Sequence, residues 1–151
     1  MADRTDVVLL SVDRFARAPL RAQLIEDGFE VIATDTWPMM RQHLRPGAKP
    51  RFVIVDLQKL PAPQEVLRDL GALMKPGRVI VLSAIGSVDA DEVERLGHVV
   101  LRRPIAIGSI VDAARAIGRD AVAESSADVA GLSGASAPHL RANGRGAERQ
   151  R

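Results

Sequence analysis

Five short apolar runs alternate with five segments whose apolar residues recur at helical spacing, and this alternation limits the fold more than any other feature. A repeated strand–helix order favours a parallel sheet with helices on both faces and right-handed connections. The sequence therefore predicts an α/β protein with a doubly wound, five-stranded (βα)5 sheet. The expected strands are 6–11, 29–33, 52–56, 78–83 and 98–101, and the expected helices are 14–27, 37–44, 64–74, 89–96 and 109–117.

The third strand is the centre of this pattern. Residues 52–55 read Phe-Val-Ile-Val, a continuous apolar run typical of a strand that is buried on both faces. Asp56 follows directly, and ligands of open α/β sheets bind outside the carboxyl ends of the strands. Asp56 is therefore the first candidate for a functional residue. The alternative is that it only caps the next turn, as Asp often does.

Proline and composition add further expectations. Pro19 lies within the first helical segment, where an interior proline costs about 3 kcal/mol, so this helix is expected to begin late, near Arg17, or to be kinked.

The chain has no cysteine, which excludes disulfides and thiolate metal sites. No apolar run approaches the ~20 residues of a membrane span, and no signal peptide is evident, so a cytoplasmic location is expected. The net charge of only +2 favours an ordinary solvated surface over a nucleic-acid footprint.

The pattern of strands and helices stops near residue 120. Residues 121–151 are rich in Ala, Ser, Gly and charged residues, and they contain few large aliphatic side chains. Such a composition buries too little surface to offset the entropy of ordering. The sequence predicts one domain over 1–120 and a low-complexity, disordered tail over 121–151. The arginines near its end are more typical of a solubilising tail than of an RNA-binding one.

Polar residues follow three of the predicted strands. Asp56 ends the third strand, Ser83 ends the fourth, and Arg103-Pro104 follows the fifth. Because parallel strands bring their carboxyl ends to one edge of the sheet, an acid, a hydroxyl and a cation are expected to meet there. The polar character common at strand ends is the alternative explanation.

These three marks give the sequence its resemblance to a known family. The motifs V-I-V-D at Asp56, V-L-S-A at Ser83 and L-R-R-P at Arg103-Pro104 resemble those of the receiver domains of two-component response regulators. The resemblance covers about residues 6–118 and implies the flavodoxin-like, CheY-like receiver fold. It implies that Asp56 accepts a phosphoryl group from a histidine kinase, that Ser83 and Arg103 bind the phosphoryl oxygens, and that Mg²⁺ is bound by acids after the first strand.

The sequence departs from the family pattern at the metal site and at the phosphoryl site. The positions of the family's acid pair fall on Ser11 and Val12, so only Asp13 and Asp56 remain as metal-ligand candidates. Mg²⁺ prefers carboxylate and water oxygens, which makes a Mg²⁺ cofactor doubtful here. Arg103 replaces the family's lysine, and we expect it to pair directly with the Asp56 carboxylate. Val100 stands where the family has a rotating aromatic residue.

We therefore expect a divergent receiver domain without an output domain, which acts by protein–protein contact and is not an enzyme. Phosphorylation of Asp56 remains an open alternative. The expected partners are a histidine kinase, a phosphotransfer protein or another regulator. The face from the fourth to the fifth helix, which many relatives use to form homodimers, carries Val88, Val93 and Ile107 as core or interface residues.

Two other functional classes are alternatives to this hypothesis. A small flavodoxin-like enzyme, or a nucleotide or flavin binder, lacks support, because the chain has no G-x-G-x-x-G or Walker motif. Its three histidines, His43, His98 and His139, stand next to no evident nucleophile. A nucleic-acid adaptor would depend on the arginines of the tail.

Overall fold

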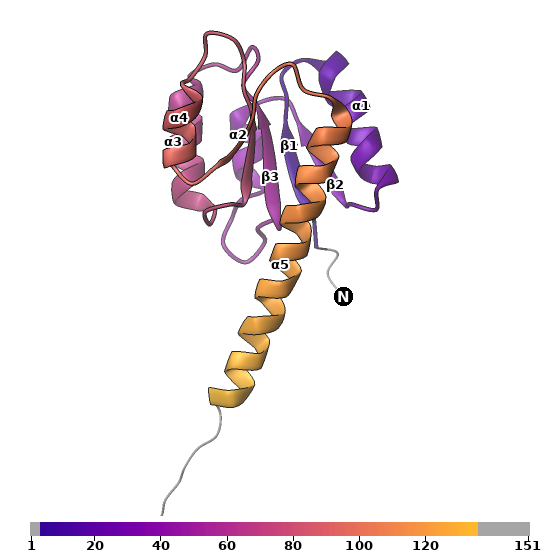
Figure 1. The fold of residues 1–151 in the computed structure, drawn as a ribbon, viewed down its shortest axis with the longest axis vertical. Helices are drawn as coiled ribbons and strands as arrows, with labels where there is room; N and C mark the ends of the chain where they lie inside the picture. Colours follow the sequence, from indigo (N-terminus) through magenta and orange to yellow (C-terminus); the bar gives the residue numbers. More distant parts are fainter. Residues whose placement is uncertain (1–3, 136–151) are drawn as a thin grey trace, which may run out of the picture. The chain divides into compact units, whose positions relative to one another are not determined.

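The computed structural model describes residues 4–135, and it describes side chains as far as residue 121. The elements alternate from β1 to α5 in the order that the sequence predicts (Figure 1). The chain divides into two compact units, Met1–Arg119 and Asp120–Arg151. The first unit contains the whole sheet and is described below.

The sheet has five parallel strands in the order β2-β1-β3-β4-β5. The strands are β1 Val7–Leu10, β2 Val31–Thr34, β3 Phe52–Asp56, β4 Val79–Leu82 and β5 Val99–Leu101. The register aligns Asp56 with Leu82 on β4, and Leu82 in turn with Leu101 on β5. The residues that follow these strands therefore meet at one edge of the sheet, as the sequence predicts.

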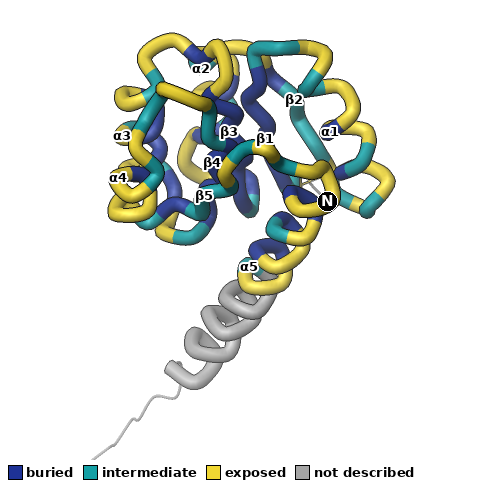
Figure 2. The backbone as a smooth tube through the Cα atoms, turned by 45° about the horizontal axis from the view of Figure 1, so that its top comes forward, coloured by how far each residue is buried: buried dark blue, intermediate teal, exposed yellow. Residues whose placement is uncertain are grey.

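The helices cover both faces of the sheet (Figure 2). One core lies under α1 and α5 and contains Leu20, Leu24, Ile110 and Ala114, while the other lies under α2, α3 and α4. Strands β1, β3 and β4 lie between the two cores and are fully buried, which explains their continuous apolar runs. The helices are α1 Arg14–Glu26, α2 Trp37–Gln42, α3 Pro63–Leu73, α4 Ala90–Arg95 and α5 Ile107–Ala135.

The expectation that α1 begins late was wrong. The helix begins at Arg14 and continues through Pro19. Asp13 caps it, because its side chain accepts a hydrogen bond from the backbone N–H of Phe15 at 2.9 Å. Leu20 and Leu24 are 4% and 0% exposed. Burial of this apolar face therefore offsets the cost of the interior proline.

The predicted end of the last helix was also wrong. The spacing of apolar residues ends α5 at Ile117, whereas the helix runs to Ala135, so part of the stretch expected to be disordered is helical. Alanine has the highest helix propensity, and it is frequent between residues 113 and 135, so helix can form there without a continuous apolar stripe. The part of the predicted tail beyond residue 135 lies outside the described residues.

Among the described residues, no helix is both long enough and apolar enough to span a membrane.

Candidate functional site

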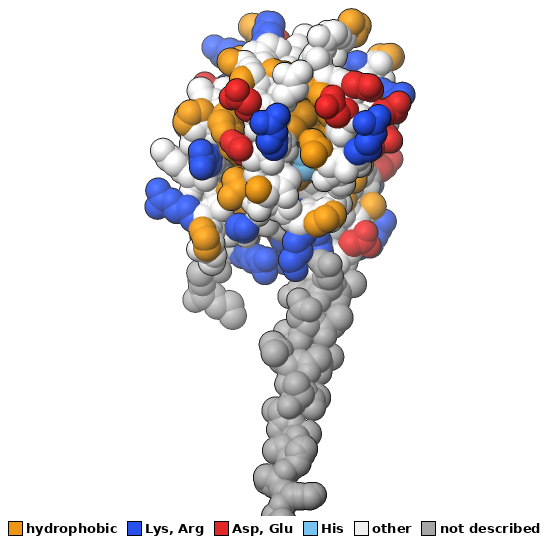
Figure 3. Space-filling model, turned by 90° about the vertical axis from the view of Figure 1, so that its left-hand side faces the viewer, with side chains coloured by type: hydrophobic (Ala, Val, Ile, Leu, Met, Phe, Trp, Pro, Cys, Tyr) orange, Lys and Arg blue, Asp and Glu red, His pale blue; other side chains and the backbone are white. Residues whose placement is uncertain are grey.

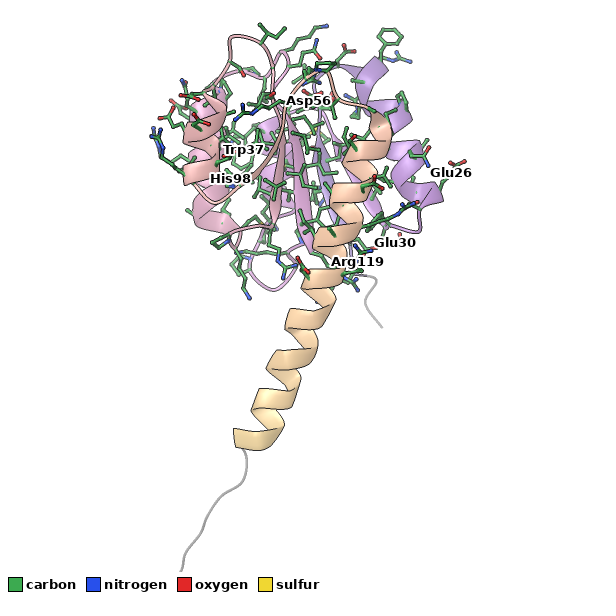
Figure 4. All side chains as sticks on the ribbon, viewed as in Figure 1. Glu26, Glu30, Trp37, Asp56, His98 and Arg119 are labelled. Atoms are coloured by element: carbon green, nitrogen blue, oxygen red, sulfur yellow. The ribbon has the colours of Figure 1, made fainter. Side chains whose placement is uncertain are left out.

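The candidate site lies at the carboxyl edge of the sheet, where Figure 4 labels Asp56 at the upper end of the strands. Asp56 is the last residue of β3 and is 2% exposed. Its Oδ1 accepts a hydrogen bond from the backbone N–H of Gln58 at 2.9 Å. Asp56 thus caps the following turn, which was the alternative reading of this residue, and it also faces the groups described next.

Arg103 pairs directly with Asp56, as the sequence analysis expected. Its Nη2 lies 2.9 Å from Oδ1 and 2.8 Å from Oδ2 of the carboxylate. Its Nη1 donates to the backbone carbonyl of Ser83 at 2.5 Å. The two contacts with the carboxylate are charge-assisted, and such contacts are among the strong hydrogen bonds of proteins. The guanidinium therefore contacts both Asp56 oxygens, either of which would accept the phosphoryl group in a phosphorylated receiver.

Ser83 completes the group of three predicted residues. It follows β4, and its backbone N–H continues the ladder by donating to the carbonyl of Leu101 on β5. Its Oγ accepts a hydrogen bond from the backbone N–H of Arg103 at 3.3 Å. Both polar groups of Ser83, the hydroxyl and the carbonyl, thus hold Arg103. The peptide bond that follows, Arg103-Pro104, is cis.

Asp13, the other metal-ligand candidate, is bound elsewhere. Its Oδ1 caps α1, and its Oδ2 lies 3.5 Å from Nζ of Lys59. The hydrogen bond from the Phe15 N–H, aided by the charge of Lys59, lowers the pKa of the Asp13 carboxyl below its ordinary value. Asp13 is therefore a capping carboxylate that already has a cation beside it.

A third cation, Arg17 of α1, contacts the backbone of the two residues that stand where the family pattern has acids. Arg17 donates from Nη1 to the carbonyl oxygen of Ser11 at 2.7 Å and to that of Val12 at 3.4 Å. Ser11 Oγ contacts the backbone carbonyl of Asp13 at 3.4 Å. Two backbone carbonyls of the loop after β1 thus accept hydrogen bonds from a guanidinium.

The residues present do not fit Mg²⁺. This ion takes oxygen ligands, usually one or two carboxylates together with waters. The carboxylates of Asp13 and Asp56 already contact cations, and Arg17 donates to the carbonyls after β1. Among the described residues, no cluster of three or more acidic, histidine or cysteine side chains could hold a metal ion. The three cations Arg17, Lys59 and Arg103 thus outnumber the carboxylates of Asp13 and Asp56 that they lie beside.

Sequence reasoning missed two of these cations, Arg17 and Lys59. Arg17 lies four residues after the Asp13 cap, which places it one helical turn from the loop that it contacts. That spacing was a usable signal. Lys59 has φ of 62°, which is in the left-handed region, and the neighbouring residues in the sequence do not predict this conformation.

Comparisons with known proteins agree on the fold. No family model matches the sequence, and no curated protein matches it either. Among solved structures, a CheY-like receiver domain protein from Methanospirillum hungatei has a TM-score of 0.67 at 16% identity, covering 81% of this chain and 99% of that one. The signal receiver domain of a Vibrio parahaemolyticus protein described as a LuxO repressor has a TM-score of 0.66 at 27% identity, covering 82% and 96%.

A third structure carries a different description. A Rhodopirellula baltica protein described as an adenylate cyclase has a TM-score of 0.68 at 18% identity, and the match covers 83% of this chain and 96% of that one. At this identity the likeness concerns the fold. Together with the strand order and the parallel sheet, these matches show that the chain has the fold of response-regulator receiver domains.

Proposed function

We propose that this chain, which has the receiver-domain fold, is a divergent receiver module of two-component signalling that acts by protein–protein contact in one fixed state. The observation that carries the proposal is the ion pair between Arg103 Nη2 and both carboxylate oxygens of Asp56. In a phosphorylated switch, this carboxylate would have to attack an incoming phosphoryl group. Here an internal cation already contacts both of its oxygens.

The electrostatics of phosphoryl transfer support the same proposal. A dianionic phosphoryl group approaches a carboxylate readily only where cations offset the repulsion, and metal ions commonly serve this purpose. The residues after β1 do not fit Mg²⁺, as described above. For a carboxylate oxygen to attack, Arg103 would have to release that oxygen of Asp56, which is 2% exposed and otherwise accepts a hydrogen bond from the Gln58 N–H. Breaking a buried pair in this way is unfavourable.

The partners that we propose are a histidine kinase, a phosphotransfer protein or another regulator, each of which would bind the module through its fixed surface. For a homodimer through α4 and α5, the available residues are fewer than the sequence suggested. Val93 is 1% exposed and belongs to the core, and Val88 packs against that core, whereas Ile107 is 38% exposed. The cytoplasmic location and the absence of an enzymatic role remain expectations.

The direct test is incubation with Mg²⁺ and a small phosphodonor, followed by intact mass measurement. The fixed-state proposal expects no phosphoryl adduct on the wild-type chain, and Arg103→Lys serves as the matched variant that restores an ammonium at this position. A stoichiometric adduct on the wild type that is absent from Asp56→Asn would contradict the proposal and would make Asp56 a phosphoacceptor.

Partner binding provides the second test. A switch depends on a difference in free energy between two states that the partner can distinguish. In a fixed-state module, Asp56→Asn should leave the affinity for a copurified partner nearly unchanged, with or without phosphodonor. A change in partner affinity of about tenfold or more on addition of phosphodonor, corresponding to roughly 1.4 kcal/mol, would contradict the fixed-state proposal if it disappears in Asp56→Asn.

A further inference from the structure

A pocket on α2 shares no residue with the Asp56 site. Its volume is about 370 Å³, and it is lined by Trp37, Pro38, Arg41, Gln42 and Arg45. Trp37 and Arg41 are four residues apart on α2, a spacing that places two side chains next to each other on a helix. Arg45 follows just after the helix ends. One short stretch of sequence thus brings an indole and two guanidinium groups to the same pocket.

Trp37 gives the pocket an ordered apolar wall. It begins α2, where Thr36 caps the helix by accepting a hydrogen bond from the Met39 N–H at 3.3 Å. The Trp37 side chain, labelled in Figure 4, packs against the core under α2, α3 and α4 but is only partly buried. In the described part of the chain, its indole N–H has no hydrogen-bond partner, and no aromatic or cationic side chain stacks on its ring. The indole is therefore held in place while part of its surface is available to another molecule.

The polar side chains of the pocket are mainly donors and carry positive charge. Arg41, Gln42 and Arg45 are exposed, and within the described residues neither arginine side chain makes an ion pair or a hydrogen bond. No acidic residue lines the pocket. On the face that carries α3 and α4, by contrast, Figure 3 shows acidic and basic side chains interspersed. The pocket therefore favours carboxylates that accompany an apolar group.

The arrangement suits a segment of a partner protein better than a small molecule. Small-molecule sites enclose most of the surface of their ligand. Every residue that lines this pocket belongs to the single segment 37–45, so no second element of the chain closes over a ligand here. A partner protein supplies the opposite wall from its own surface. Trp and Arg are also among the residues that most often dominate the binding energy of protein–protein interfaces.

We propose that this pocket is a docking site for an acidic segment of a partner protein. An aromatic side chain of that segment packs against Trp37 and Pro38, and carboxylates on either side of it pair with Arg41 and Arg45. A guanidinium binds a carboxylate through two parallel N–H donors, which fixes orientation as well as adding attraction. This inference rests on the proposed function, because it assigns a surface and a partner chemistry to the proposed docking role, but it involves no residue of the Asp56 site.

Trp37 itself provides the assay, because the chain has one tryptophan and no tyrosine. The probe is the blocked peptide acetyl-Asp-Glu-Phe-Glu-Asp-amide, titrated into the full chain while the tryptophan emission is recorded. We expect a saturable change in emission, with an affinity that falls as salt is added. The same peptide with lysines in place of its acids should cause no change, and the peptide with glycine in place of phenylalanine should bind more weakly.

Matched variants test the two guanidinium groups. Arg41→Gln and Arg45→Gln should each weaken binding of the peptide by about fivefold, the upper value for an exposed ion pair, and the double variant by about tenfold or more. Arg21→Gln, at an exposed position of α1 outside the pocket, removes the same charge and should bind the peptide as the wild type does. Because all three positions are exposed, these variants should fold normally.

Four results would overturn the inference. They are no saturable change in emission with the acidic peptide, equal weakening by Arg21→Gln and Arg41→Gln, tighter binding of adenosine monophosphate than of the peptide, and a change in emission with protein concentration alone that accompanies a dimer in sedimentation. The last would make a second copy of the chain the occupant. Each of these leaves the fixed-state proposal standing. Binding of the peptide that requires phosphodonor and is lost in Asp56→Asn would support the docking site but contradict the fixed state.

Discussion

Removal of the Arg103 side chain tests the ion pair on which the proposed function rests. In Arg103→Ala, the Asp56 carboxylate loses both contacts with Nη2 and keeps the hydrogen bond from the Gln58 N–H. The Asp56 side chain is 3% exposed and the Arg103 side chain 26% exposed, so the acid is left charged in a site that bulk water reaches poorly.

The structure places the cost of this change between two limits. Removing one partner of a fully buried pair destabilises a protein by about 3–5 kcal/mol, and a solvent-exposed pair contributes roughly 0–1 kcal/mol. This pair has one buried and one partly exposed member, and water can enter the space that the guanidinium leaves. We expect Arg103→Ala to lower the free energy of unfolding by about 2 kcal/mol, within a range of roughly 1–3 kcal/mol.

Urea unfolding followed by circular dichroism measures this quantity, and a double-mutant cycle isolates its cause. Asp56→Asn combined with Arg103→Ala removes the unpaired charge, so the double variant should be more stable than Arg103→Ala alone. Arg68→Ala, at an exposed position on α3, is the matched control and should stay within about 0.5 kcal/mol of the wild type.

The reasoning would be refuted by a loss below about 0.5 kcal/mol in Arg103→Ala, which would place the pair among weak surface ion pairs. It would also be refuted if the double variant were less stable than Arg103→Ala by the full cost of Asp56→Asn alone. In that case the two side chains would not be energetically coupled.

The remaining predictions concern the metal, the pH dependence and the tail. Mg²⁺ titration should show no sub-millimolar binding near Asp56; such binding, abolished by Asp56→Asn, would show that Asp13 has been recruited as a ligand. Burial lowers the pKa of His98 below its ordinary value, although its hydrogen bond to the Leu67 carbonyl opposes the shift. As the pH falls, His98 is therefore protonated in the unfolded chain before it is protonated in the folded one. The free energy of unfolding should decrease as the pH drops below about 6.5 toward the lower pKa of the folded state, and His98→Gln should reduce this pH dependence. Limited proteolysis should trim the chain to about residue 120 and leave a cooperatively melting core, because the residues beyond carry few large aliphatic side chains; a core that no longer melts cooperatively after truncation at Asp120 would contradict this.

The sequence predicted the sheet well because burial determines its pattern. Residues 52–55 and 79–82 are apolar without interruption, as strands covered on both faces must be, and their order along the chain sets the topology. The convergence of Asp56, Ser83 and Arg103 follows from that topology. The pairing of Arg103 with Asp56 was expected because Arg103 stands where the family has its lysine, and a buried carboxylate needs a counterion.

Other features depend on contacts that single-sequence patterns do not contain. The persistence of α1 through Pro19 depends on the packing of Leu20 and Leu24 against the sheet. The extension of α5 beyond Ile117 depends on helix propensity where the apolar stripe has ended. The contact of Lys59 with Asp13 joins residues 46 positions apart, through a backbone conformation that lysine rarely adopts.

The unusual residues of this site change its charge while leaving the sheet intact, because they follow the strands and do not lie within them. Arg17, Lys59 and Arg103 contact loop carbonyls and carboxylates, whereas the strands pack through their own apolar side chains.

The cation that neutralises Asp56 is therefore tethered to the chain. A bound metal ion responds to its free concentration, since a ligand stabilises the state it binds by mass action. A tethered guanidinium is present under all conditions at which the protein is folded. A module built this way can change state only through a partner or ligand that distinguishes two conformations, and its resting state should be independent of Mg²⁺.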